Sequence, residues 1–293
     1  MRTAPECVPC YFKQVASVAA RCGRRAARDV HAAYRATAAL LPRLRMSRSP
    51  AENTFDVLRA VQRILRAPDP FGAERAHFNR VALALLPRLQ RAVSRSPRPL
   101  ITAAHVAAAG NIIDLGILTE VNIHAALHAV LRRGFAHDDS AAFERLVESV
   151  DRILYLLDNA GEIVFDRVLI EELVRRGKQV TAVVNREPIL NDALMQDAHD
   201  VGLTAVCRVI TSGSGTIGKI PGKGSPLFRR EFRTAPLIIA KGHGNFETLD
   251  RCQRPLCFIL KAKCAVVARH LGVRVGDAVL KLRTGSTASH TSR

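Results

Sequence analysis

Residues 152–166 read RILYLLDNAGEIVFD, and within this stretch the pattern of apolar residues changes from that of a strand to that of a helix. This change decides the fold. It begins with a short apolar run, RILYLL, which is typical of a strand buried on both faces. The turn Asp158–Gly161 follows, and the apolar positions Ile163, Val164 and Val168 then have the spacing of a helix. A strand that leads directly into a helix predicts a βα unit of a parallel sheet.

Four more apolar runs follow along the chain, and they read KQVTAVVN, LTAVCRVIT, APLIIAKG and RPLCFILKA. Each is short, and the segments between them are long enough for a helix or a loop. This alternation is typical of an open sheet with helices on both faces. We therefore predict a three-layer α/β/α domain with a mostly parallel sheet over residues 150–282.

The part of the chain before this domain has a helical pattern instead. In the segment AENTFDVLRAVQRILR, the apolar residues Phe55, Leu58, Val61 and Leu65 share one helix face. Prolines divide the region into segments of ordinary helix length. We predict an N-terminal helical domain over residues 1–149 and, after the α/β/α domain, a disordered basic tail over residues 283–293.

Charge is unevenly distributed along the 293 residues. The chain has 44 Lys and Arg against 26 Asp and Glu, and its first 98 residues hold 19 basic and 6 acidic residues. Such a basic region is compatible with nucleic-acid binding. However, aromatic residues make up only 5% and Trp is absent, so side chains on which bases could stack are scarce. We therefore favour solvated helix faces and do not expect nucleic acid as a partner.

The cysteines and the apolar segments indicate the compartment. The chain has seven cysteines, an odd number, and its first residues, MRTAPECVPCYFKQ, lack the apolar stretch of a signal peptide. These features favour reduced thiols rather than disulfides. No window of about 18 residues is continuously apolar, which argues against a membrane span. The sequence thus predicts a cytoplasmic protein with no membrane partner.

Oxygen-bearing side chains follow two successive strands. Asp158 and Asn159 end the first run of the sheet, and Asp192 lies in the connection after the second run. Ligands bind at the carboxyl ends of strands in open α/β sheets, and carboxylate and amide oxygens suit hard cations. We predict a divalent metal site at these three residues. The alternative is that both aspartates only cap helices.

A second group of residues is predicted to bind an anionic ligand. Lys241 ends an apolar strand between glycines, in a chain that uses Arg for 36 of its 44 basic residues. We expect its ammonium to bind phosphate and to lie outside the packed core. The alternative is chance, since five of the eight lysines lie between Lys219 and Lys263. Backbone N–H groups at a helix start also favour anions. The predicted substrate-binding residues are Asn111, Ala160, Gly161, Glu162, Lys241, Gly244, Asn245 and Glu247; for Asn111 the alternative is a helix cap.

Six motifs in register carry a family resemblance. They read ECVPCYFKQ, AAAGNIIDLG, LYLLDNAGEIVFD, PILNDA, IAKGHGNFETL and FILKAKCAVVA, and they extend from about Cys7 to Leu282. Together they resemble the domain of unknown function 89 family, the metal-dependent damage-control phosphatases, in its stand-alone prokaryotic branch. The resemblance implies a helical part on an α/β/α domain, a metal at Asp158, Asn159 and Asp192, and Lys241 near the phosphate. The glycine-rich loop 212–225 departs from the family pattern, so we expect it to influence the choice of substrate.

Three cysteines form a separate group. Cys7 and Cys10 lie one helical turn apart, and the resemblance implies that Cys264 approaches them. A thiolate cluster of this kind would hold a soft metal such as zinc or act as a redox pair. The alternative is that the three pack as small apolar side chains.

We predict a metal-dependent phosphatase that acts on phosphate esters of small metabolites: sugar phosphates, nucleotides or damaged phosphometabolites. Asp158 and Lys241 are the predicted catalytic residues, and Mg²⁺, Mn²⁺, Co²⁺ or Ni²⁺ is the expected cofactor. One alternative is a carboxyl methyltransferase that uses S-adenosylmethionine, although the chain lacks an acidic residue for the ribose where the second strand ends. The other alternative is a basic module that binds nucleic acid.

Overall fold

The computed structural model describes residues 1–23, 26–110 and 133–283. Its strands are β1 (His137–Asp138), β2 (Arg152–Leu156), β3 (Gln179–Val184), β4 (Arg208–Thr211), β5 (Leu237–Lys241), β6 (Leu256–Lys261) and β7 (Ala278–Arg283). Its helices are α1 (Val8–Arg21), α2 (Ala27–Leu40), α3 (Pro50–Ile64), α4 (Gly72–Ser94), α5 (Pro99–Ala109), α7 (Ser140–Glu148), α8 (Glu162–Arg175), α9 (Met195–Asp200), α10 (Pro226–Thr234), α11 (Gly242–Leu249) and α12 (Ala265–Leu271).

The strands form one sheet in the order β1-β7-β6-β5-β2-β3-β4. Strands β2 to β6 are parallel, whereas β7 runs antiparallel to β6 and pairs with β1. In the centre, Leu154 of β2 lies between Thr181 of β3 and Ile238 of β5. The chain builds β3 and β4 on one side of β2 and then returns to its other side with β5. This reversal creates a topological switch point between β2 and β5, where open α/β sheets bind their ligands.

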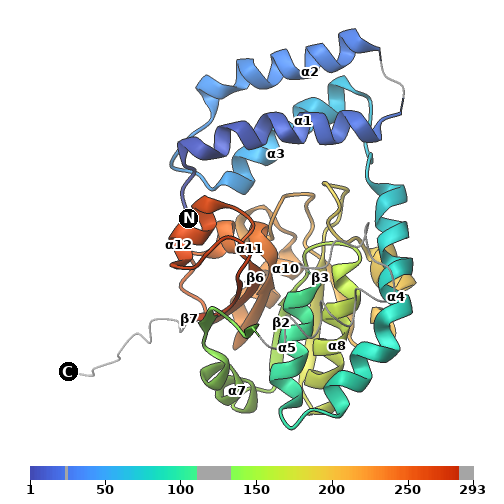
Figure 1. The fold of residues 1–293 in the computed structure, drawn as a ribbon, viewed down its shortest axis with the longest axis vertical. Helices are drawn as coiled ribbons and strands as arrows, with labels where there is room; N and C mark the ends of the chain where they lie inside the picture. Colours follow the sequence, from blue (N-terminus) through green and yellow to red (C-terminus); the bar gives the residue numbers. More distant parts are fainter. Residues whose placement is uncertain (24–25, 111–132, 284–293) are drawn as a thin grey trace, which may run out of the picture.

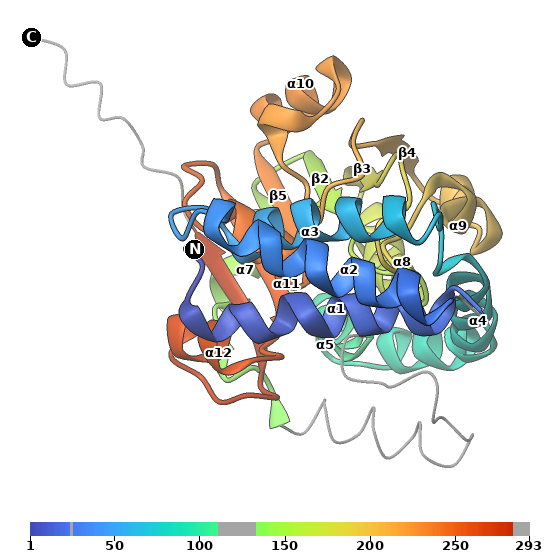
Figure 2. The same cartoon turned by 90° about the horizontal axis from the view of Figure 1, so that it is seen from above.

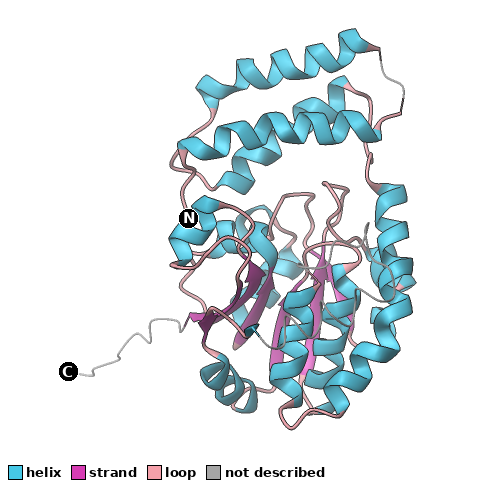
Figure 3. Cartoon of the chain, in the orientation of Figure 1, coloured by secondary structure: helices cyan, strands magenta, loops and turns pink. Residues whose placement is uncertain are grey.

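Helices cover both faces of the sheet, so the strands form the middle layer (Figure 3). One face packs against α4, α5 and α8 through a large apolar core that includes Tyr155 and Phe165. The other face packs against α10, α11 and α12 through a core that includes Phe228 and Phe246. Strands buried on both sides explain the continuous apolar runs in the sequence. The predicted three-layer α/β/α fold is confirmed.

Helices α1, α2 and α3 form a further layer with its own apolar core, and Figures 1 and 2 show them together above the sheet. Helix α3 begins at a capping box, in which the Ser49 N–H donates to Glu52 Oε2 and the Glu52 N–H donates to Ser49 Oγ. Ile189 and Ile217, from loops of the sheet domain, insert into the same core. This layer is therefore fixed above the loops that follow the strands.

The packing divides the chain at a different place from the predicted boundary at residue 149. Helices α4, α5 and α7 contribute Leu89, Leu100 and Phe143 to the core of the sheet domain, and β1 joins the sheet itself. The apolar face of the sheet requires these helices as its cover, because an exposed face of that size would be unfavourable. Among the described residues, only α1 to α3 form a separate helical layer. Of the predicted tail, Arg283 ends β7, and the rest lies outside the described residues.

Within the described ranges, no helix has both the length and the apolar character that spanning a membrane requires. All seven cysteines are free thiols.

Candidate active site

Two loops meet at the carboxyl ends of β2 and β3. Asn159 and Asp192 form an isolated antiparallel bridge, and the N–H of Ala193 donates to the carbonyl of Asp158 over 2.9 Å. The N–H of Ala160 donates to the carbonyl of Asn191, also over 2.9 Å. These backbone bonds bring the predicted metal ligands of both loops together beside the switch point.

Asp158 is buried against the backbone of the neighbouring strand end. Gly242, which follows β5, has a φ of +75°, and a Cβ atom there would lie 1.8 Å from Oδ2 of Asp158. Glycine is therefore required at this position for its conformation and for the space it leaves. The absence of a side chain at Gly242 admits the carboxylate of Asp158.

Asp192 is held by an amide from the end of β3 and by a lysine of the glycine-rich loop. Asn185, at the end of β3, donates from Nδ2 to Oδ2 of Asp192 over 2.8 Å. Lys219 of the glycine-rich loop places its Nζ 3.6 Å from the same oxygen. Both Asp192 and Lys219 are buried. The Asp192 side chain is thus oriented by an amide and faces a buried cation.

The site concentrates negative charge away from water. Burial raises the pKa of Asp158 well above its usual range, and the nearby carboxylates of Glu162 and Asp192 raise it further. Burial also raises the pKa of Asp192 to about 6, although Lys219 opposes this shift. Asn159 donates from Nδ2 to Asp158 over 3.0 Å and to Glu162 over 2.9 Å. Carboxylates that repel one another in a buried site favour a bound cation.

The chemistry of these donors fits a hard divalent metal. Asp158 and Asp192 supply carboxylate oxygens, and Asn159 supplies an amide oxygen beside them, which is the donor type that Mg²⁺ and Mn²⁺ prefer. No group of three His, Cys, Asp or Glu side chains in the described ranges is arranged to hold a metal. A metal at this corner would therefore need the amide of Asn159 as well as the two aspartates.

Lys241 lies in a buried ion pair. Its side chain is fully buried, and Nζ donates to Oδ1 of Asp166 over 2.6 Å and to the carbonyl of Ala107 over 2.9 Å. Asp166 also accepts from the hydroxyl of Tyr155. The expectation that Lys241 lies outside the packed core is wrong, because alternation along β5 turns it toward α5 and α8. Two of its three donor hydrogens are already used by the protein.

The N–H groups of Ala160 and Gly161 also have partners within the protein. Ala160 donates to Asn191, and Gly161 donates to Oδ1 of Asn79 over 2.7 Å. Asn79 in turn donates to Asp197. The expectation that these two N–H groups bind phosphate is therefore wrong in this conformation. They fix the turn that carries Asp158.

Gly244 and Asn245 hold the glycine-rich loop. A Cβ atom on Gly244 would lie 3.0 Å from the nitrogen of Gly218. Asn245 is fully buried; its Oδ1 accepts from the N–H of Lys219 over 2.8 Å, and its Nδ2 donates to the carbonyl of Lys241 over 2.7 Å. Both predicted substrate contacts are thus positioning residues for the backbone around the site.

Glu162 and Glu247 differ in their surroundings. Glu162 lies at the proposed metal corner, which consists of Asp158, Asn159 and Asp192. It accepts a hydrogen bond from Asn159 and forms an ion pair of 3.8 Å with Lys263. Glu247 instead faces the helical layer, where the N–H of Ala51 is a hydrogen-bond donor to it, and burial raises its pKa to about 7. The structure supports a site role for Glu162 and gives no contact of Glu247 with the metal corner. Asn111 lies outside the described residues.

The three cysteines are near one another but form no metal site. Burial raises the pKa of the Cys7 thiol, and Cys10 and Cys264 are close enough to raise it slightly further. No metal-holding group of three Cys, His, Asp or Glu side chains exists among the described residues. The Sγ of Cys264 instead accepts from the N–H of Val267 and caps α12. This arrangement favours the packing interpretation over a thiolate metal cluster.

Sequence reasoning missed three residues of the site: Asn79, Asn185 and Lys219. For Lys219 a signal existed, since it is a lysine within a glycine-rich loop of an arginine-rich chain. Asn185 ends the second strand, where a nucleotide-binding site would have an acidic residue for the ribose. Nothing in the sequence indicates that it contacts Asp192. Asn79 lies on α4 and had no local signal, because its partner Gly161 is 82 residues away.

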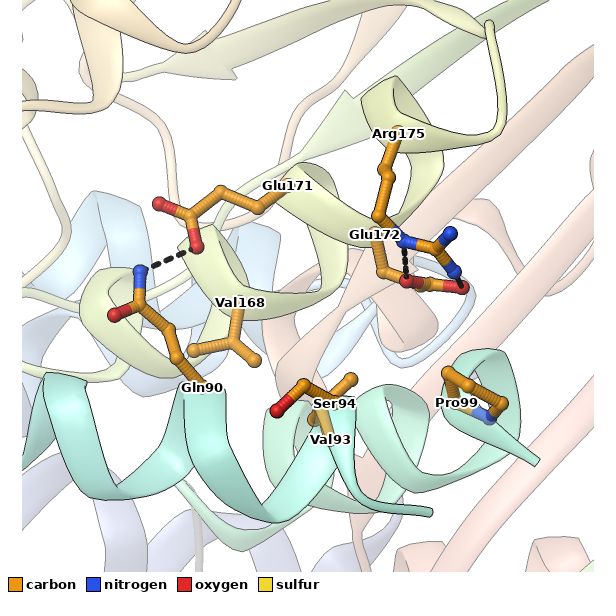
Figure 4. Close-up of a pocket in the computed structure, with 8 residues that line it drawn as sticks. All are labelled: Gln90, Val93, Ser94, Pro99, Val168, Glu171, Glu172 and Arg175. Carbon is orange, nitrogen blue, oxygen red and sulfur yellow. Dashed lines mark hydrogen bonds and ion pairs between the residues drawn. The ribbon is translucent and has the colours of Figure 1, made fainter. Parts of the chain in front are cut away.

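A surface cavity of about 420 Å³ lies between α4 and α8, at the opposite end of α8 from Glu162. Figure 4 shows that its polar side chains bind one another, with Gln90 bonded to Glu171 and Arg175 bonded to Glu172. This cavity has no part in the site at the strand ends.

Comparison with known proteins gives the family. Residues 3–279 match the damage-control phosphatase ARMT1-like domain. The chain belongs to this family. It is therefore a phosphohydrolase of the damage-control class, which confirms the predicted activity and the predicted resemblance. Phosphatases of this class are generally metal-dependent.

Individual relatives cover most of the chain. An uncharacterized protein of Methanocaldococcus jannaschii is 36% identical over an alignment of 292 positions that covers 95% of each chain. A damage-control phosphatase of Archaeoglobus fulgidus is 37% identical over 230 residues, covering 76% of this chain and 79% of the relative. The crystal structure of a Pyrococcus horikoshii protein of the domain of unknown function 89 family superposes with a TM-score of 0.89 at 28% identity, covering 96% and 99% of the two chains.

Proposed function

We propose that this phosphatase hydrolyses phosphate esters of small metabolites with a divalent metal held by Asp158, Asn159 and Asp192. Sugar phosphates, nucleotides and damaged phosphometabolites are the substrate classes, and Mg²⁺, Mn²⁺, Co²⁺ and Ni²⁺ are the metals. The observation that carries the proposal is the bridge between Asn159 and Asp192 at the switch point of the sheet, beside the buried Asp158.

The residues of the site have distinct roles in this proposal. A divalent metal there would supply electrophilic stabilisation of charge that develops on the phosphate. Asp158 and Asp192 hold the metal, and Asn185 fixes the orientation of Asp192 through the 2.8 Å hydrogen bond. Burial keeps bulk water from screening these charges, which strengthens their interaction with a phosphate ester.

A screen of phosphorylated sugars and nucleotides with each of the four metals tests the proposal. We expect phosphate release that stops on chelation with EDTA and returns when the metal is added back. Asp192→Asn should lower turnover by about 10² or more, as expected for a group that stabilises the transition state electrostatically. The matched control is Asp200→Asn, because Asp200 is an exposed carboxylate on α9. Activity that persists in EDTA, or an Asp192→Asn variant as active as the control, would refute it.

The expected cytoplasmic location belongs to the same proposal. It rests on seven free thiols, which a reducing compartment preserves. Fractionation of cells that produce the protein, followed by immunodetection, tests it. Recovery outside the cytoplasmic fraction would contradict it.

A further inference from the structure

Lys219 is a buried cation with unused hydrogen-bonding capacity. Its side chain is fully buried, and within the described part of the chain its Nζ has no hydrogen-bond partner. The nearest charge is Oδ2 of Asp192 at 3.6 Å, a distance too long for a hydrogen bond. An ammonium carries three donor hydrogens, and leaving them unsatisfied in the interior is costly. This arrangement points to a ligand that is not part of the protein.

Contacts between the glycine-rich loop and α11 fix the position of Lys219. Gly218 has a φ of +70°, and a Cβ there would lie 2.3 Å from the carbonyl oxygen of Gly244. The next residue, Lys219, donates its backbone N–H to Oδ1 of the buried Asn245. Loop and helix α11 are therefore in van der Waals contact, with a directional hydrogen bond between them. The first turn of α11 holds Lys219 where its ammonium faces the metal corner.

The charges around Lys219 indicate the kind of ligand. Its ammonium lies 3.6 Å from Oδ2 of Asp192, and Asp192 is bridged to Asn159, so it faces the residues that hold the metal in the proposed function. A phosphate ester bound at that metal has further oxygens that carry negative charge. Those oxygens would fall within reach of an ammonium that already lies beside Asp192, and a charge-assisted hydrogen bond would satisfy it.

Lys241, the lysine first expected in this role, is poorly placed for it. Its Nζ is bonded to Asp166 and to the carbonyl of Ala107, so its charge is already balanced. We propose that Lys219, and not Lys241, is the lysine that binds the substrate phosphate, with phosphate monoesters as the ligand class. This inference rests on the proposed function, since it uses the same metal corner.

Binding of inorganic phosphate to the Mg²⁺-saturated protein tests the inference by isothermal titration calorimetry. Lys219→Met should weaken phosphate binding about 10- to 100-fold, the range for loss of a hydrogen bond from a charged group. Lys223→Met is the matched control, because Lys223 lies in the same loop and is exposed, with its Nζ 5.5 Å from the ring centroid of Phe55. The control should bind phosphate like the wild type. Thermal unfolding verifies that each variant is folded, and Lys219→Gln replaces Lys219→Met if the latter is not.

Two results would overturn the inference. One is a folded Lys219 variant that binds phosphate as tightly as the wild type. The other is a variant in which only Mg²⁺ binding becomes tighter, because Lys219 would then serve merely as a counter-ion of Asp192. The binding assay requires no turnover. A wild type that binds phosphate through Lys219 but hydrolyses no ester would refute the proposed function and leave this inference standing.

Discussion

The ammonium of Lys241 donates a 2.6 Å hydrogen bond to Oδ1 of Asp166, and both side chains are completely buried. This ion pair joins the end of β5 to α8 across the face of the sheet. Burial raises the pKa of Asp166 to about 6, while the charge of Lys241 limits that shift. We therefore expect Lys241, in the motif IAKGHGNFETL, to contribute to the stability of the fold.

Removing one partner of this pair should destabilise the protein strongly. Lys241→Met leaves a buried carboxylate without its counter-ion, so the free energy of unfolding should fall by about 3 to 5 kcal/mol. Chemical denaturation measures the change, and the double variant Lys241→Met/Asp166→Asn should recover part of it. As a control, Arg98→Met breaks the more exposed pair with Glu144 and should cost less than about 1 kcal/mol. Equal losses in the two single variants would show that the buried pair has no special role.

Asp158→Asn should have opposite effects on stability and on metal binding. Without metal, the variant removes a carboxyl whose ionisation is disfavoured by burial and by Glu162 and Asp192, so it should be more stable than the wild type by about 1 kcal/mol or more. With Mn²⁺, only the wild type should gain stability, because ligand binding to the folded state shifts the unfolding equilibrium. Thermal unfolding with and without Mn²⁺ gives both quantities. A variant that is still stabilised by Mn²⁺ like the wild type would exclude Asp158 as a ligand.

Gly242→Ala should damage the site as well as the backbone. A Cβ at residue 242 would lie 1.8 Å from Oδ2 of Asp158, so either the carboxylate or the backbone must move. We expect a loss of more than about 3 kcal/mol in unfolding free energy, together with weakened Mn²⁺ binding. Gly276→Ala is the matched control, since its φ is +98° and no atom lies within 4 Å of the added Cβ. The control should lose only about 1 to 2 kcal/mol of backbone strain and keep its metal affinity. Similar behaviour of both variants would argue against the close approach to Asp158.

Glu247 should make stability depend on pH. Its pKa is raised from 4.5 to about 7 by burial, so the folded state holds a proton that the unfolded state releases between these values. The wild type should therefore lose stability relative to Glu247→Gln as the pH rises from about 4.5 to about 7, by up to about 3 kcal/mol, with no further change above. Urea denaturation of both proteins across this range measures the difference. A difference that is constant with pH would mean that the carboxyl is not buried as described.

The amino-acid sequence by itself determined the class of fold, and it predicted that the proposed metal ligands lie near one another. Asp158, Asn159 and Asp192 could be found because each follows an apolar, β-branched run, and the carboxyl ends of parallel strands meet at one edge of a sheet. These are local signals, since period and turn composition are properties of short segments. For the same reason the helical pattern at Phe55, Leu58, Val61 and Leu65 could be recognised, and these residues lie in or directly after α3.

Only the tertiary structure decided the partners of the charged and polar groups. Lys241 and Asp166 are 75 residues apart, and their pairing depends on which face of the sheet α8 covers. Nothing in the sequence near Gly161 indicates that its N–H bonds to Asn79 of α4. The same holds for the helices that cover the sheet before residue 149, because an apolar helix face does not specify the surface against which it packs.

Lys219 illustrates the physical reason most clearly. Its glycine-rich loop has no hydrophobic period from which a conformation could be predicted, and a backbone with φ of +70° at Gly218 is fixed only by contact with α11. Burial and the distance to Asp192 arise when that loop packs against the rest of the chain. Strand order and turn chemistry are local and can be predicted from sequence, whereas the partner of a buried charge depends on packing between distant segments.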